Sequence, residues 1–101
     1  MAEATITRKV AKHLKAMKLS GEPVEWVKIH GSGMQRAGEP DYSITYHGRS
    51  IKAELKDKGK SPTKLQKYRM DQWLKAGAVV GVVREIEDLE LLLSEARINN
   101  S

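Results

Sequence analysis

Two short runs of strand-forming residues around a tight turn restrict the fold of this chain more than any other feature. The first run covers residues 41–46, the turn 47–49 and the second run 50–56. Strands connected this closely pair antiparallel, and alternate side chains of each strand point to opposite faces of the sheet. The pattern therefore predicts a β-hairpin whose two ends away from the turn lie side by side.

Three charged side chains are expected to meet at those ends. Asp41 opens the first strand, and Glu54 and Lys56 lie two residues apart on one face of the second. Two carboxylates beside an ammonium group can hold a hard divalent cation, with room for a substrate phosphate and water. The alternative is a surface ion-pair ladder that contributes about 0–1 kcal/mol to stability. The opposite face of the second strand would be filled by Ile51, Ala53 and Leu55.

The rest of the chain predicts an α/β domain with the element order α-β-β-β-α-β-α. Helical periodicity or strand composition locates the other elements at residues 3–18, 24–29, 61–76, 78–83 and 87–97. A helix stands between the hairpin and strand 78–83, so this strand should pair parallel with strand 50–56. Its continuous apolar composition predicts burial on both faces. With 101 residues and no interdomain linker, the chain is expected to form a single domain, residues 1–101.

Two polar residues on the predicted helices could reach the charged end of the hairpin. Glu3 falls on the inward stripe at the start of the first helix, where the helix dipole would also explain it. Gln66 falls on the inward stripe of helix 61–76, where bonding to the backbone would satisfy it equally. Ser61 is a suitable N-cap for that helix, and Pro62 fits its first position. The same stripe contains Met70, Trp73 and Leu74.

The charge distribution favours a polyanionic partner, although solvated surface lysines explain it equally well. The net charge is +5, and the excess lies within residues 1–60, since residues 61–101 hold equal numbers of acidic and basic residues. The chain has no cysteine, so a metal would be bound by oxygen rather than by thiolate. No stretch has the length of a membrane span or the pattern of a signal peptide, so we expect a cytoplasmic protein.

The element order and several motifs resemble the VRR-NUC family of the PD-(D/E)xK nuclease superfamily, in particular its small stand-alone phage members. These motifs are Gly38-Glu39-Pro40-Asp41, Glu54-Leu55-Lys56, Ser61-Pro62, Gln66 and the run 73–80. The family's Val-Arg-Arg motif is not intact, because a single arginine, Arg84, occupies that region. The resemblance covers nearly the whole chain. It implies a restriction-endonuclease-like core with a mixed sheet flanked by helices.

The resemblance also implies a site and a cofactor. The groups that would bind Mg²⁺ or Mn²⁺ are the carboxylates of Asp41, Glu54 and Glu3 and the backbone carbonyl of Leu55. Gln66 would complete the catalytic set. Lys56, kept protonated beside Glu54, would orient the attacking water or offset developing negative charge.

The function expected from this resemblance is divalent-metal-dependent hydrolysis of DNA by an endonuclease. The substrate would be branched DNA, such as a four-way (Holliday) junction, in phage recombination or processing. Symmetrical cleavage of two strands requires two sites, so we expect a two-fold homodimer. Two other hypotheses remain open: a non-catalytic nucleic-acid-binding module, and a structural phage protein whose basic face binds an acidic protein. The candidate DNA contacts are Lys9, Lys12, Lys15, Ser32, Gln35, Arg36, Lys58 and Lys60.

Overall fold

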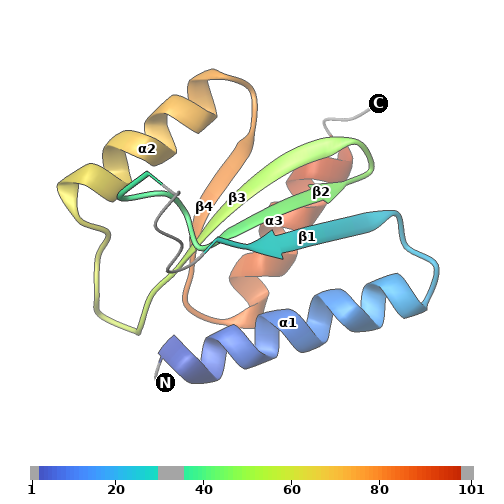
Figure 1. Cartoon of the computed structure of the whole chain (residues 1–101). Helices are drawn as coiled ribbons and strands as arrows, with labels where there is room; N and C mark the ends of the chain where they lie inside the picture. Colours follow the sequence, from blue (N-terminus) through green and yellow to red (C-terminus); the bar gives the residue numbers. More distant parts are fainter. Residues whose placement is uncertain (1–2, 30–35, 99–101) are drawn as a thin grey trace.

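The order of helices and strands confirms the α-β-β-β-α-β-α arrangement (Figure 1). The computed structural model describes residues 3–29 and 36–98, with only the backbone of Glu3. The elements are α1 (Glu3–Leu19), β1 (Val24–Lys28), β2 (Tyr42–Tyr46), β3 (Arg49–Leu55), α2 (Lys64–Lys75), β4 (Val79–Val83) and α3 (Ile86–Ile98). Their bounds agree with the expected ones to within one residue, except at the start of α2.

The four strands form one mixed sheet in the order β1-β2-β3-β4. β1 pairs antiparallel with β2 and β2 with β3, whereas β3 and β4 are parallel and are connected through α2. The turn between β2 and β3 consists of His47 and Gly48, whose φ angles of 50° and 78° are typical of a two-residue hairpin turn. The expected hairpin and the expected parallel pair are both confirmed.

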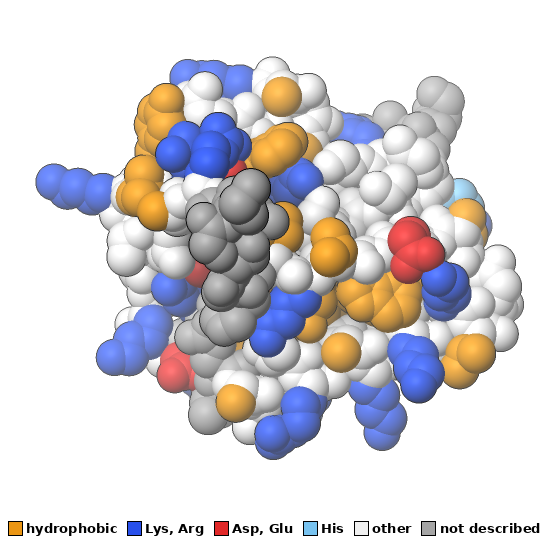
Figure 2. All heavy atoms as spheres, viewed as in Figure 1, with side chains coloured by type: hydrophobic (Ala, Val, Ile, Leu, Met, Phe, Trp, Pro, Cys, Tyr) orange, Lys and Arg blue, Asp and Glu red, His pale blue; other side chains and the backbone are white. Residues whose placement is uncertain are grey.

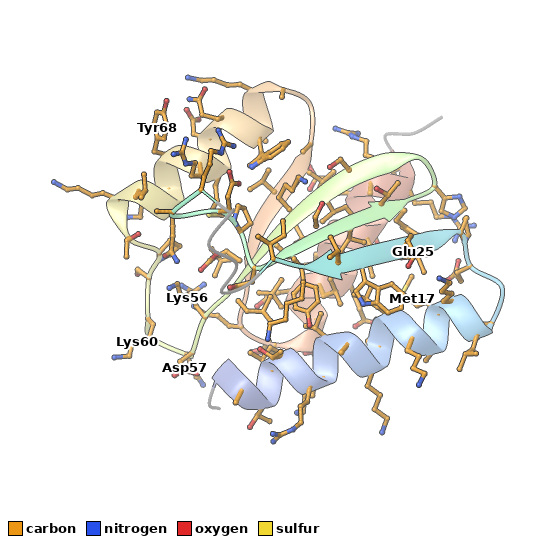
Figure 3. All side chains as sticks on the ribbon, viewed as in Figure 1. Met17, Glu25, Lys56, Asp57, Lys60 and Tyr68 are labelled. Carbon is orange, nitrogen blue, oxygen red and sulfur yellow. The ribbon has the colours of Figure 1, made fainter. Side chains whose placement is uncertain are left out.

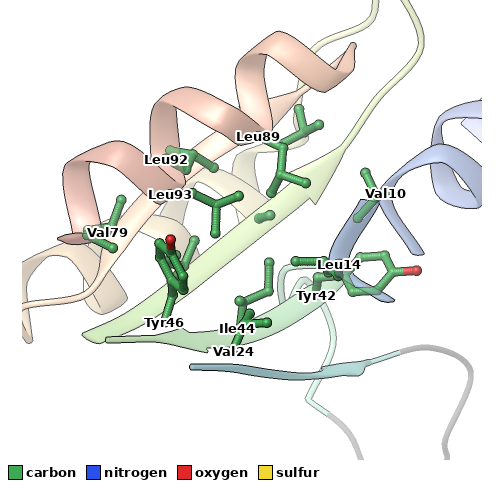
Figure 4. Close-up of a cluster of buried hydrophobic side chains, with 14 of the residues drawn as sticks. Val10, Leu14, Val24, Tyr42, Ile44, Tyr46, Val79, Leu89, Leu92 and Leu93 are labelled. Atoms are coloured by element: carbon green, nitrogen blue, oxygen red, sulfur yellow. The ribbon is translucent and has the colours of Figure 1, made fainter. Parts of the chain in front are cut away.

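α1 and α3 cover one face of the sheet, and the hydrophobic core lies between these helices and the strands (Figures 1 and 4). Val10 and Leu14 of α1 and Leu89 of α3 are fully buried there, in one cluster with Ile44 and Ile51. Burial of each such aliphatic side chain contributes about 1.5–3 kcal/mol. The inward positions expected on the last helix are confirmed, because its buried residues are Leu89, Leu92, Leu93 and Ala96.

α2 covers part of the opposite face. Gly81 of β4 faces α3, since a Cβ atom on it would lie 2.7 Å from a methyl carbon of Leu92. The neighbouring residues of β4 point the other way. Together with α2 they line a groove of about 390 Å³, whose apolar residues are Pro62, Met70, Leu74, Val80 and Val82. α2 therefore lies across the sheet from α3.

The predicted start of α2 is wrong. Thr63, not Ser61, is the N-cap, and Pro62 precedes the helix instead of opening it. The side-chain oxygen of Thr63 accepts a hydrogen bond from Gln66 N at 3.1 Å, and Gln66 Oε1 accepts one from Thr63 N at 2.8 Å. This capping box satisfies two backbone amides at once, which a cap at Ser61 could not do with Lys64 three residues later.

The expected burial of α2 and β4 is also wrong. None of the residues of α2, all of which the structure describes, is buried, and Leu74 is 58% exposed. Val80, Gly81 and Val82 of β4 are only partly buried, because β4 is the last strand of the sheet. Within the described ranges, no helix is long and apolar enough to cross a membrane.

Candidate active site

β3 carries its charged side chains on the face opposite the core. Ile51, Ala53 and Leu55 enter the core, so Lys52 and Glu54 between them point toward the side of α2. Both are buried, since only 1% of Glu54 and 8% of Lys52 is exposed. Among the charged residues that the structure describes, no other is buried as a whole residue, although the side chain of Glu39 is also only 8% exposed. The predicted division of this strand into an apolar and a charged face is confirmed. The charged face is more deeply buried than the sequence indicated.

Asp41 closes the end of the hairpin against β3. Its Oδ2 atom accepts a hydrogen bond from Leu55 N at 2.8 Å, whereas the next amide, Lys56 N, donates to Val83 O at 3.1 Å. Leu55 N–H therefore points toward β2 and Lys56 N–H toward β4. Because the N–H and C=O of one strand residue point to the same neighbour, we expect the Leu55 carbonyl on the side of Asp41 as well.

Glu54 and Lys56 form an ion pair beside Asp41. Glu54 Oε2 lies 3.5 Å from Lys56 Nζ, and the two side chains are only 2% and 17% exposed. Figure 3 shows Lys56 at the end of β3, with Lys60 on the loop that leads from it to α2. These exposures exclude the alternative of a surface ion-pair ladder. Burying an ionised carboxylate is costly, so this pair at a strand end is a candidate for a binding or catalytic role.

The donor chemistry of this corner fits a hard divalent cation. The carboxylates of Asp41 and Glu54 and the carbonyl of Leu55 are oxygen ligands, and Mg²⁺ keeps several waters when only one or two carboxylates bind it. Among the described side chains, no group of three or more His, Cys, Asp or Glu residues could hold a metal ion. The two carboxylates and the carbonyl are the oxygen ligands that this corner could offer. The third predicted carboxylate ligand, Glu3, has a side chain outside the described part of the structure.

Gln66 has a structural task at the start of α2. The hydrogen bonds that the structure describes for Gln66 are the two of the capping box with Thr63. The sequence left open whether Gln66 bonds to the backbone or reaches the charged end of the hairpin, and these bonds correspond to the first possibility. Its membership of the catalytic set stays a prediction.

The candidate DNA contacts lie in several places. Lys9, Lys12 and Lys15 are exposed on α1, and Lys58 and Lys60 are exposed on the loop after β3. Figure 2 shows several basic side chains along α1, at the bottom of the view. Arg36 instead forms an ion pair with Glu39, its Nε atom donating to Oε2 at 2.6 Å. Ser32 and Gln35 lie outside the described residues.

A second layer of polar side chains, not expected from the sequence, lies behind the site. Lys52 Nζ donates a hydrogen bond to Ser43 Oγ at 2.7 Å and lies 4.0 Å from the centre of the Trp73 ring. Trp73 Nε1 in turn donates to Glu39 Oε1 at 2.8 Å. Burial lowers the pKa of Lys52, while the charge of Glu39 acts in the opposite direction. The available signal was the spacing of Lys52, which lies two residues before Glu54 and hence on the same face.

Arg84, which follows β4, has a structural role that the sequence did not indicate. Its Nη2 atom donates to Lys60 O at 2.7 Å and so holds the loop after β3. Arg84 also lines a cavity of about 650 Å³ of mixed charge, whose other lining residues are Lys9, Lys58, Glu85, Ile86, Glu87 and Asp88. Two of the candidate DNA contacts thus lie around one hollow of the surface.

Comparisons with known proteins identify the fold. No family model matches the sequence, and no curated protein matches it at a significant level. A solved structure described as "VRR_NUC domain" superimposes with a TM-score of 0.71 and 21% identity, covering 93% of this chain and 97% of that one. A second, a "VRR_NUC domain protein", gives a TM-score of 0.70 and 20% identity over 95% of this chain and 88% of that one. At these identities the likeness establishes that the chain has the fold of VRR_NUC domains.

Proposed function

We propose that this protein is a divalent-metal-dependent endonuclease that hydrolyses phosphodiester bonds of DNA. Two contacts at the end of β3 carry the proposal: the hydrogen bond from Leu55 N to Asp41 Oδ2, and the buried ion pair of Glu54 with Lys56. The fold, shared with solved VRR_NUC domains, supports the same assignment.

The chemistry of the corner suits phosphodiester hydrolysis. A bound divalent cation would lower the pKa of a water ligand and neutralise the phosphate. Asp41 and Glu54 would hold that cation, Asp41 through the carboxylate oxygen that does not accept from Leu55 N. Lys56 Nζ, 3.5 Å from Glu54, would orient the attacking water or offset negative charge on the phosphate. Because Glu54 lies within a buried strand, its carboxylate needs little reorganisation before reaction.

We propose branched DNA as the substrate and a two-fold homodimer as the active form. One domain of 101 residues offers a single such corner, and symmetrical cleavage of a junction requires two. The exposed lysines of α1 and of the loop after β3 would bind the phosphate backbone.

Cleavage of labelled DNA tests the proposal. The wild-type protein should cut a four-way junction with Mg²⁺ or Mn²⁺ and should be inactive in EDTA, with nicked, flap and duplex DNA measured in parallel. Asp41→Ala and Lys56→Ala should each lower the cleavage rate at least about a hundredfold, while salt-sensitive binding of the junction persists. The matched controls are Asp71→Ala and Lys75→Ala, which remove an exposed ion pair on α2.

Two results would count against the proposal. Cleavage at the wild-type rate by both site variants would remove Asp41 and Lys56 from the chemistry. Binding of the junction with no metal-dependent cleavage by the wild type would identify a non-catalytic nucleic-acid-binding module instead.

A further inference from the structure

The segment that carries Asp41 is held by the sheet and, in addition, by α2 from outside it. The register of β2 with β3 begins at the pair Tyr42 and Ala53, so Asp41 lies one residue before the ladder between these strands. The carbonyl oxygen of Asp41 accepts from Ile29 N at 2.7 Å, and this bond ties it toward β1. The distance of Asp41 from β3 depends on its hydrogen bond with Leu55 and on the contacts that hold residues 37–40 in position.

One face of α2 contacts this segment at three successive residues. Arg69 Nε donates to Ala37 O at 3.2 Å. Leu65 lies against Gly38, where an added Cβ atom would be 2.6 Å from its Cγ. Trp73 donates to Glu39 as described. The three contacting residues of α2 are spaced four apart, so they form one continuous stripe along the helix: Leu65, Arg69 and Trp73.

The contact between Trp73 and Glu39 is part of a network that extends to side chains of the sheet. The Glu39 side chain is only 8% exposed and also pairs with Arg36. Behind it, the ring of Trp73 covers the ammonium group of Lys52, which is bonded to Ser43. Ser43 lies two residues after Asp41 on β2, and Lys52 lies two residues before Glu54 on β3. The network therefore reaches the strands that carry both carboxylates of the candidate site.

We propose that this stripe of α2 is a clamp that positions Asp41 for metal binding, with Glu39 and Trp73 as its positioning residues. The inference rests on the proposed metal site. Its physical basis is that a buried hydrogen bond to a carboxylate is strong and directional. Loss of the Trp73–Glu39 bond would remove the α2 contact nearest to Asp41 and loosen residues 39 and 40, so that the Asp41 carboxylate could move away from Leu55. A displacement of about 1 Å is enough to impair a metal or catalytic site.

Two variants and two matched controls test the clamp. Trp73→Phe removes the indole donor but keeps an aromatic ring over Lys52, and Glu39→Gln removes the charge but keeps an acceptor. Trp26→Phe and Glu25→Gln make the same chemical changes on β1. The measurements are amide hydrogen exchange of Leu55 by NMR without metal, and Mn²⁺ affinity by electron paramagnetic resonance. We expect roughly five- to tenfold faster exchange and a similarly weaker Mn²⁺ affinity in Trp73→Phe, with a smaller change in the same direction in Glu39→Gln.

The outcomes separate the clamp from the proposed function. Cleavage by Trp73→Phe that recovers at high Mn²⁺ concentration, with core amides of β2 and β3 exchanging as in wild type, supports the clamp. Unchanged Leu55 exchange and Mn²⁺ affinity in both variants overturn the clamp and leave the endonuclease proposal standing. Equal acceleration of all core amides also overturns it, because the effect is then global unfolding. A wild type that neither binds Mn²⁺ nor cleaves DNA overturns both.

Discussion

At the scale of single residues, the unusual feature is two charged side chains inside a small domain. Glu54 and Lys52 lie on the same face of β3 with 1% and 8% exposure. Charged groups are seldom buried so deeply without a partner, and each here has one, Lys56 for the carboxylate and Ser43 with the Trp73 ring for the ammonium. Burying a charged group lowers the stability of the fold, and its interaction partners offset only part of that loss. This net cost favours a functional explanation for the two buried charges.

The lowered pKa of Lys52 predicts a specific pH dependence. The cost of the buried charge is fully present below the folded-state pKa and is relieved as the pH rises toward the unfolded value of 10.5. Relative to Lys52→Met, the wild type should therefore gain stability toward pH 10.5. At pH 7, Lys52→Met should be as stable as the wild type or more stable by up to about 4 kcal/mol. Urea denaturation of both proteins from pH 7 upward checks this, and parallel curves would contradict it.

Gly38 is required by the contact with α2 as well as by its backbone. Its φ of +82° alone disfavours alanine by about 1–2 kcal/mol, and the added Cβ would also overlap Leu65. We expect Gly38→Ala to lose about 1–3 kcal/mol more than Gly21→Ala. Gly21 is the matched control, because its φ is +89° and nothing lies within 4 Å of its Cβ position. Chemical denaturation measures the free energy of unfolding of both variants. Equal losses would show that α2 can shift away from the added Cβ atom without a cost in stability.

At the scale of elements, α2 differs from the other helices in what it contacts. α1 and α3 bury apolar stripes in the core, whereas α2 directs Leu65, Arg69 and Trp73 at the segment before β2. Its residues stay at least partly exposed, so packing contributes less to its stability and capping contributes more. The start of α2 is therefore a sensitive point.

The observed N-cap predicts that the hydroxyl group of Thr63, and not that of Ser61, contributes to stability. Thr63→Ala should lower the free energy of unfolding by about 1 kcal/mol, because it breaks the capping box with Gln66. Ser61→Ala, two residues earlier, should be close to neutral. Thermal or urea unfolding distinguishes the two, and a larger effect at Ser61 would restore the N-cap expected from the sequence.

At the scale of the whole molecule, the two faces of the sheet have separate tasks. One face is closed by α1 and α3 and holds the core. The other holds the candidate site and is covered in part by α2, beside the edge strand β4. An edge strand next to exposed apolar side chains is a common place for chains to associate. If the protein cleaves junctions as proposed, a second copy at that edge would supply the second site.

This arrangement predicts a dimer that depends on the groove between α2 and β4. Light scattering after gel filtration should give twice the mass of one chain, and Leu74→Glu should give a monomer. Leu91→Glu is the control, because Leu91 is similarly exposed, at 69% against 58%, but lies on α3. A monomeric wild type would contradict the two-fold form, and a dimer unaffected by Leu74→Glu would place the interface elsewhere.

The element order and the outline of the site could be derived from the sequence because they depend on local patterns. Alternation of period two placed Glu54 and Lys56 on one face, and a two-residue turn brought Asp41 to the same end. The helix between two strands required the parallel pairing of β3 with β4.

Only the tertiary structure decided how deeply the site is buried and what holds it. The choice of Thr63 over Ser61 as N-cap and the burial of Lys52 beneath Trp73 both depend on where α2 lies on the sheet. Glu39 and Trp73 are hydrogen-bonded although they lie 34 positions apart in the sequence. Such contacts follow from the packing of distant segments, and no local period of the sequence encodes them.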